Sequence, residues 1–363
     1  MKRLRSGYTT GACAAAAAKG AAIAAISGQL QSHSEIPFPD GRRVQFPLTG
    51  CILGDGADSS ARCSVVKDAG DDPDVTNGTE ITVEVVVAET EDMQGSGIAI
   101  IGGRGVGTVT KPGLALPVGS PAINPVPLAM ITKAIEEAFL ELGRNIRSCK
   151  VQVTVSIPEG ERLARYTLNS RLGIIGGLSV LGTTGVVVPI SSAAWTATIS
   201  ASMDVAREMG AREIVLSTGR TSERAVEVYC RLPEEAYVMM GDYLEFSLHE
   251  AARHQFRKIH LAGMWAKIVK AAMNIPQTHV RHGALDPEQA ISFLGRLTEQ
   301  GEELHYLTGA NSAREIYERL AQHGDTEIIH RVCLAAREYC QTVSGLPVTV
   351  YLVQANGRVV LTV

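Results

Sequence analysis

The second half of the chain alternates short apolar runs with helical stretches, and this pattern limits the possible fold more than any other feature. The runs are GIIGG, VVVPI, EIVLSTG, YVMMGD and KIHLAGM, and helices are predicted between them, for example over residues 193–209 and 222–230. Such alternation is typical of a parallel sheet with helices on its faces. We therefore predict that residues 166–363 form an α/β domain with an open, mainly parallel sheet and a terminal hairpin turning at Asn356-Gly357.

The first half has another pattern and predicts an α+β domain over residues 1–165. The segments ITVEVVVAET and VQVTVSIPEG place an apolar side chain at every second residue, which is the period of a half-buried strand. A glycine- and proline-rich region over residues 95–127 and a predicted helix over residues 128–142 separate them. Because the pattern changes after the second segment, we place the domain boundary near residues 158–170.

The segment SGYTTGACAAAAAKGAAIAAISG follows a basic start and superficially matches a secretory signal. Lys19 interrupts its alanine run, and alanine is a weak hydrophobe but the best helix former. The segment is also too short and too weakly apolar for a membrane span, which needs about twenty apolar residues. We predict a retained helix that Thr9 or Thr10 caps and that ends near Gly28, without membrane association.

Composition narrows the class of protein. The 363 residues carry a net charge of −4 and no basic block, which argues against nucleic acid as a partner. The seven scattered cysteines contain no C-x-x-C pair and indicate reduced thiols in the cytoplasm. His279 and His282 lack the further ligands of a zinc site, so we predict no protein-bound metal. A homo-oligomer is compatible with this composition.

Glycine-rich turns follow the predicted strands of the second half. In an open parallel sheet, ligands bind outside the carboxyl ends of the strands. The predicted cofactor-binding residues in these turns are Gly176, Gly177, Gly182, Thr183, Thr184, Thr218, Gly219, Arg220, Gly241 and Asp242. Lys267 and His279 follow another predicted strand, and a solvated helix face and a partly buried structural histidine are their alternative interpretations.

Two loops of the first half carry candidate chemistry. Residues 102–107 space their glycines like a dinucleotide-binding loop, but neither a helix nor a Walker lysine follows. Arg104 and Lys111 are then the possible anion partners there. The segment KDAGDDPDVTNG contains clustered aspartates that are expected to form Asx turns, with an acid or base of shifted pKa as the alternative.

Five of these segments together resemble the CbiD family. They are GYTTGACAAAAAKGA, KDAGDDPDVT, GVGTVTKPGLALPVGSPAINPVP, RLGIIGGLSVLGTTG and STGRTSE, and they occur in the family's order between Gly7 and about His279. The family comprises the cobalt-precorrin-5B C(1)-methyltransferases. The resemblance implies a two-domain CbiD-like fold and S-adenosyl-L-methionine-dependent methylation of carbon 1 of cobalt-precorrin-5B, which gives cobalt-precorrin-6A in cobalamin biosynthesis.

The resemblance also suggests roles for the candidate residues. Methyl transfer from a sulfonium is an in-line displacement, so positioning and exclusion of water matter most, and the anionic tetrapyrrole needs basic side chains. We expect the second domain to hold S-adenosylmethionine and the first to face the tetrapyrrole. The catalytic candidates are Asp68, Asp72 and His279. The substrate-binding candidates are Thr9, Thr10, Lys67, Arg104, Lys111, Arg171 and Lys267.

Two other functions stay open at this point. A nucleotide-dependent kinase or ligase would use residues 102–107 as a phosphate cradle. A non-catalytic tetrapyrrole-binding protein would lack affinity for S-adenosylmethionine.

Overall fold

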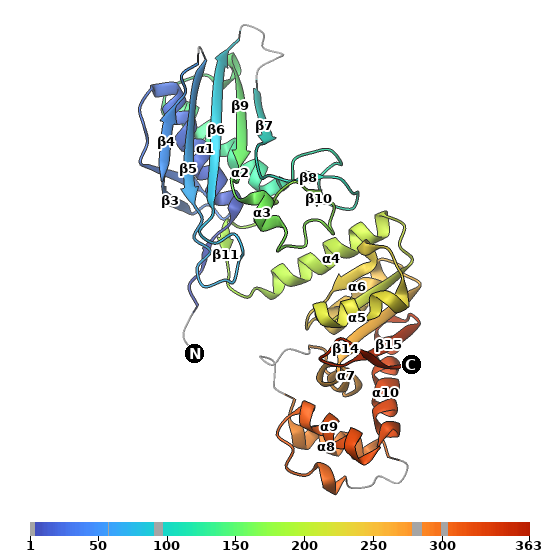
Figure 1. The fold of residues 1–363 in the computed structure, drawn as a ribbon. Helices are drawn as coiled ribbons and strands as arrows, with labels where there is room; N and C mark the ends of the chain where they lie inside the picture. The colour runs from blue at the N-terminus through green and yellow to red at the C-terminus, as the bar shows by residue number, and fades with distance from the viewer. Residues whose placement is uncertain (1–3, 57, 91–96, 278–284, 299–303) are drawn as a thin grey trace. The chain divides into compact units, whose positions relative to one another are not determined.

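A computed structural model describes the chain except for residues 1–3, 57, 91–96, 278–284 and 299–303. The chain divides into two compact units, Met1–Ser191 (unit 1) and Ser192–Val363 (unit 2) (Figure 1). Each unit is described by itself below.

Unit 1 is built on a five-stranded sheet whose order is β4-β5-β6-β9-β7. The strands are β4 (Gly50–Leu53), β5 (Ser59–Val66), β6 (Glu80–Glu89), β9 (Cys149–Ser156) and β7 (Gly97–Gly102). Neighbouring strands are antiparallel except β7, which runs parallel to β9. The predicted alternation in β6 and β9 is confirmed: their apolar side chains are buried against helices α1 (Thr10–Ser27) and α2 (Pro125–Glu141), which cover one face (Figure 1).

Helix α1 lies in the core of unit 1, and fifteen of its eighteen residues are buried. The Thr9 hydroxyl caps it by accepting a hydrogen bond from the Ala12 amide, and Gly28 ends it with a left-handed φ of 70°. Lys19 is buried as well and pairs with Glu137 and Glu141 of α2. Among the described helices, α1 alone is long and apolar enough to cross a membrane, but 83% of it is buried inside the protein. The predicted helix is therefore an element of the core of unit 1.

Two pairs of short strands connect the loops of unit 1. Strand β1 (Gly7–Tyr8) pairs with β11 (Val186–Val187), and β8 (Thr108–Val109) pairs with β10 (Ile174–Ile175), both antiparallel. A hairpin, β2 (His33–Pro37) and β3 (Arg43–Pro47), and helix α3 (Gly160–Ala164) complete it.

The runs GIIGG and VVVPI are therefore not strands of the parallel sheet, and that prediction was wrong. They contain β10, which pairs with β8, and β11, which pairs with β1, and both partner strands belong to unit 1. Because these pairings tie residues 174–187 to unit 1, the division of the chain falls after Ser191 and not at residues 158–170.

Unit 2 contains the parallel sheet, and its strand order is β13-β12-β14-β15-β16. Strands β13 (Tyr237–Met239), β12 (Glu213–Ser217), β14 (Lys258–Met264) and β15 (Val348–Val353) are parallel, as predicted. Strand β16 (Val359–Thr362) is antiparallel to β15 and confirms the terminal hairpin. The helices are α4 (Ser192–Glu208), α5 (Arg220–Cys230), α6 (Leu244–Arg253), α7 (Trp265–Ala272), α8 (Pro287–Arg296), α9 (Ala313–His323) and α10 (Thr326–Ser344).

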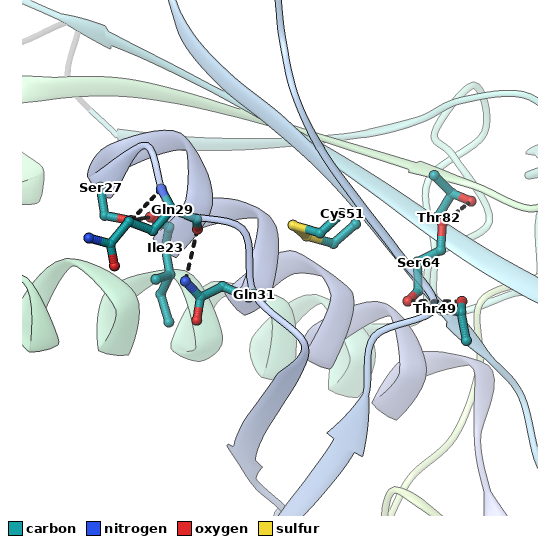
Figure 2. The surroundings of a disulfide bond; sticks show 9 residues. Ile23, Ser27, Gln29, Gln31, Thr49, Cys51, Ser64 and Thr82 are labelled. Carbon is teal, nitrogen blue, oxygen red and sulfur yellow. Dashed lines mark hydrogen bonds between the residues drawn. A yellow bond between two sulfur atoms is a disulfide. The ribbon is translucent and has the colours of Figure 1, made fainter.

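Two of the seven cysteines form a disulfide, which corrects the prediction of reduced thiols throughout. Cys51 of β4 and Cys63 of β5 are direct partners in the antiparallel register, with Cα atoms 4.1 Å apart (Figure 2). Their spacing of twelve residues in the sequence gives no sign of this pairing. The free cysteines are Cys13, Cys149, Cys230, Cys333 and Cys340.

Candidate functional site

The carboxyl end of the sheet in unit 2 brings half of the predicted cofactor residues to one edge. Thr218 and Gly219 follow β12, and Gly241 and Asp242 follow β13. From β12 the chain first passes to β13 on one side and later to β14 on the other. Such a change of direction opens a crevice at the carboxyl ends of the strands, where open α/β sheets bind ligands. Since α7 begins directly after β14, Lys267 also belongs to this edge, where it forms an ion pair with Asp242.

The start of α5 leaves room for a ligand. The N-cap residue is Gly219, so no side chain caps the first amides of the helix. A Cβ placed on Gly219 would meet no atom within 4 Å. Arg220, the first residue of the helix, is exposed. Amide groups in the first turn of a helix favour negative charge. Beneath them, the buried Glu223 accepts a hydrogen bond of 3.1 Å from the Ser217 hydroxyl.

Two aromatic side chains that the sequence analysis missed stand beside this edge. Trp195 of α4 lies 3.6 Å from where a Cβ of Gly241 would be, and its ring stacks on Tyr243 at a centroid distance of 6.5 Å. Trp195 is 39% exposed, so part of its side chain is accessible. The sequence does not distinguish Trp195 from an ordinary helix residue, because only the fold brings it close to Gly241.

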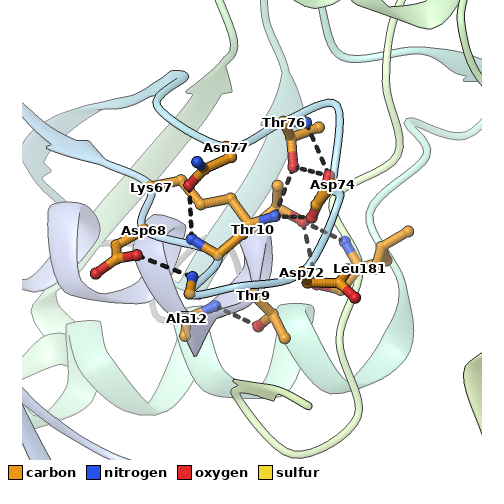
Figure 3. Close-up of polar contacts among 12 residues, drawn as sticks. Thr9, Thr10, Ala12, Lys67, Asp68, Asp72, Asp74, Thr76, Asn77 and Leu181 are labelled. Atoms are coloured by element: carbon orange, nitrogen blue, oxygen red, sulfur yellow. Dashed lines mark hydrogen bonds and ion pairs between the residues drawn. The ribbon is translucent and has the colours of Figure 1, made fainter. Parts of the chain in front are cut away.

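The other half of the predicted cofactor residues lies in unit 1. Three of the five follow Leu181, which is hydrogen-bonded to the start of α1 (Figure 3). The Thr10 hydroxyl donates to the Leu181 carbonyl at 3.1 Å and accepts from the Leu181 amide at 3.0 Å. A Cβ on Gly182 would overlap the Thr9 side chain. The Thr184 hydroxyl donates a hydrogen bond to the Val186 carbonyl and accepts one from the Val186 amide. Gly182, Thr183 and Thr184 therefore belong to a different unit from Thr218 and Asp242.

Lys67 and its loop are occupied by contacts within unit 1. Lys67 is 3% exposed, and its ammonium group pairs with Asp74 and donates to the Thr76 hydroxyl at 2.5 Å (Figure 3). Asp72 accepts a hydrogen bond of 2.8 Å from the Ile190 amide. Both side chains hold the loop in place.

The three catalytic candidates do not form one described cluster. Asp68 is half-exposed and receives two hydrogen bonds from the Arg5 guanidinium at 2.5 and 2.8 Å, which hold the pKa of that carboxyl below its usual range. Asp72 lies in the same loop. His279 lies outside the described residues.

The glycines of residues 102–107 serve close backbone packing. The amides of Gly103, Val106 and Gly107 donate to carbonyl groups of unit 1 at 2.7 to 3.2 Å. A Cβ on Gly177 would overlap the backbone oxygen of Gly105. With these amides engaged and no helix following, the loop is a poor phosphate cradle.

Two basic candidates of unit 1, Lys111 and Arg171, are joined by a hydrogen bond, and the space beside Gly176 is open. The Lys111 ammonium donates to the Arg171 carbonyl at 3.4 Å. A Cβ on Gly176, whose φ is 84°, would meet no atom within 4 Å.

A cavity of about 420 Å³ lies on the open face of the unit 1 sheet, since its lining residues in β5, β6 and β9 alternate with the side chains that are buried against the helices. Most of its lining residues carry polar side chains: Gly50, Ile52, Arg62, Ser64, Glu80, Thr82, Glu84, Arg104, Thr154, Ser156 and Pro158. Of these residues the sequence analysis named only Arg104. The alternation of apolar and polar residues in β5, β6 and β9 could have identified the others, because residues between the buried valines must face outward.

Comparisons with known proteins agree over nearly the whole chain. Residues 1–189 match the CbiD family, and residues 277–363 match the family described as CbiD, C-terminal domain. The cobalt-precorrin-5B C(1)-methyltransferase of Desulfotalea psychrophila is 49% identical over 368 residues, 98% of this chain and 97% of that protein. The protein of the same name from Geobacillus kaustophilus is 40% identical over 98% of this chain and 94% of its own length.

One solved structure is also similar. The crystal structure of a cobalamin biosynthesis protein (cbiD) from Archaeoglobus fulgidus is 26% identical, covers 88% of this chain and 85% of its own, and has a TM-score of 0.38.

Proposed function

The chain belongs to the CbiD family, and on this premise we propose that it transfers the methyl group of S-adenosyl-L-methionine to carbon 1 of cobalt-precorrin-5B, giving cobalt-precorrin-6A in cobalamin biosynthesis. The observation that carries the proposal is the 49% identity to a protein of that name across 98% of the chain.

For the methyl donor we propose the carboxyl end of the unit 2 sheet. S-adenosylmethionine supplies the electrophilic methyl group when bound. The features that support this placement are the open space over Gly219, the uncapped start of α5 and the exposed ring of Trp195. Arg220 would bind the donor's carboxylate, Asp242 a hydroxyl or amino group, and Trp195 would stack on the purine.

For the anionic tetrapyrrole we propose unit 1. Arg104, Lys111 and Arg171 are its remaining basic candidates, since Lys67 is buried in an ion pair. Their work is to hold the flat substrate by its carboxylates so that the reacting carbon is in line with the methyl group. If a base is needed, Asp68, Asp72 and His279 are the proposed proton acceptors.

We expect the enzyme to act in the cytoplasm without nucleic acid or membrane partners.

Calorimetric titration with S-adenosylmethionine and its demethylated product, beside ATP, tests the proposal. Arg220→Ala should weaken donor binding roughly tenfold, the value of one charge-assisted hydrogen bond. Arg224→Ala is the matched control, because Arg224 is also exposed on α5 but follows the first turn. Unchanged binding in Arg220→Ala would place the donor elsewhere, and binding of ATP alone would favour the kinase or ligase. Conversion of cobalt-precorrin-5B then separates the enzyme from a non-catalytic carrier.

A further inference from the structure

The cavity on the open face of the unit 1 sheet holds two cations and two anions that are not paired with each other. Arg62 of β5, Glu80 and Glu84 of β6, and Arg104 line it. Within the described part of the chain, none of these four side chains takes part in a hydrogen bond or ion pair. All four are exposed, so their charges are available to a ligand.

The register of the sheet sets opposite charges side by side. Arg62 and Glu84 are direct partners in the antiparallel pair β5–β6. The Cβ atoms of such partners are about 4.5–5.5 Å apart. A ligand that satisfies both groups must therefore carry an anion and a cation that are themselves close together.

The floor and the wall of the cavity are fixed by the fold. Thr82 is the register partner of both Ser64 and Ser156, and the hydroxyls of Ser64 and Thr82 are 3.1 Å apart. Arg104 is held at the end of β9, since the Ile157 amide donates a hydrogen bond to the Arg104 carbonyl at 2.8 Å. Ile52, the partner of Arg62 in β4, adds an exposed apolar side chain.

We infer that this cavity binds the α-amino-acid group, an ammonium and a carboxylate on one carbon atom. Arg62 receives the carboxylate and its register partner Glu84 receives the ammonium, while Arg104 and Glu80 add one further charge of each sign and Ile52 suits an apolar side chain. The volume of about 420 Å³ lies in the range of small-molecule sites. This group has two sources, a free amino acid or the methionyl end of the methyl donor, and only the second source rests on the proposed function.

The charges argue against ligands of a single sign. A dicarboxylate would meet Glu80 and Glu84, and a diamine would meet the two arginines. Like charges placed together oppose binding and thereby select against wrong ligands.

The test is ligand-observed NMR on the full chain with L-methionine, succinate and putrescine. L-methionine should bind, and Arg62→Ala and Glu84→Gln should each weaken it roughly tenfold, the value of one charge-assisted hydrogen bond. Lys150→Ala is the matched control, because Lys150 is an exposed charge on the same face of β9 outside the cavity. Succinate or putrescine bound as tightly as L-methionine, or L-methionine binding that neither variant weakens, would overturn the inference, as would no binding.

A second arm distinguishes the two sources. S-adenosylmethionine and 5′-methylthioadenosine, which lacks the amino-acid group, are titrated into the same variants. If Arg62→Ala and Glu84→Gln weaken S-adenosylmethionine and leave methylthioadenosine unchanged, the cavity holds the donor and its placement in unit 2 is wrong. If S-adenosylmethionine is unchanged, the cavity takes the free amino acid. If the proposed function is wrong, neither the parent chain nor any variant should bind S-adenosylmethionine, while L-methionine should still bind as described above.

Discussion

Lys67 shows how strongly one buried charge depends on its partner. Its ammonium is 3% exposed and is held by Asp74 and Thr76. Asp74→Asn would leave the ammonium buried without its counter-charge, so we expect a loss of about 3 kcal/mol in the free energy of unfolding at pH 7. Denaturant unfolding measures it. Asp40→Asn is the control: Asp40 pairs with Arg42 on the surface, and its loss should leave the melting temperature nearly unchanged.

The same pair predicts a pH dependence. Burial raises the pKa of Asp74, but the Lys67 ammonium and hydrogen bonds from Thr76 outweigh it, and the pKa lies below its usual range. A depressed pKa in the folded state gives stability that is present above the unfolded value, about 3.9, and is lost as the pH falls through the folded value. Asp74→Asn should therefore flatten the fall in stability below about pH 4. An acid limb identical to that of the parent chain would contradict this account.

Gly177 is a glycine whose packing role could not be predicted from its neighbours in the sequence. It was predicted to bind the cofactor, and in the structure a Cβ there would overlap the backbone oxygen of Gly105. Gly177→Ala should lower the free energy of unfolding by about 1–3 kcal/mol, because a backbone atom cannot move aside as a side chain can. Gly219→Ala should be close to neutral in the same measurement, since a Cβ there meets open space. Equal stabilities would mean that the Gly105 loop can yield.

Helix α1 shows what a segment's composition can and cannot predict. The alanine run and the threonine cap predicted a helix and its end at Gly28, and the structure confirms both. That the helix is buried nearly all round could not be predicted, because small residues line every side and no periodic apolar stripe appears. The strands β10 and β11 were misplaced for a related reason: a short apolar run has too few residues to show a period.

Because α1 is enclosed, it should not accept larger side chains. Ala17 is fully buried, and Ala17→Leu should reduce the free energy of unfolding by about 1–3 kcal/mol through overpacking. Ala197→Leu is the matched control in an exposed position of α4. Thermal unfolding of both variants tests the packing. A variant Ala17→Leu as stable as the control would show that α1 is less tightly enclosed than the structure indicates.

At the scale of the whole molecule, the sequence predicted two domains and a parallel sheet in the second, but it misplaced the boundary. The core of unit 1 includes Leu178 and Val180, while the main core of unit 2 begins at Ile199. The predicted cofactor residues are divided between the two units for the same reason. The turns after true parallel strands, Thr218–Arg220 and Gly241-Asp242, were grouped with Gly176–Gly185, which belong to unit 1.

Fragments of the chain test this division. Residues 1–191 should fold alone with a cooperative thermal transition, because they contain the complete core of unit 1. Residues 1–165 lack Leu178 and Val180 and the hydrogen bonds of Leu181 to Thr10. Loss of the two buried side chains alone removes roughly 3–6 kcal/mol, a large part of the stability of a domain. The shorter fragment should therefore melt at a much lower temperature or fail to fold. Equal melting of the two fragments would place the boundary near residue 165, because β10 and β11 would then contribute nothing to the fold they join.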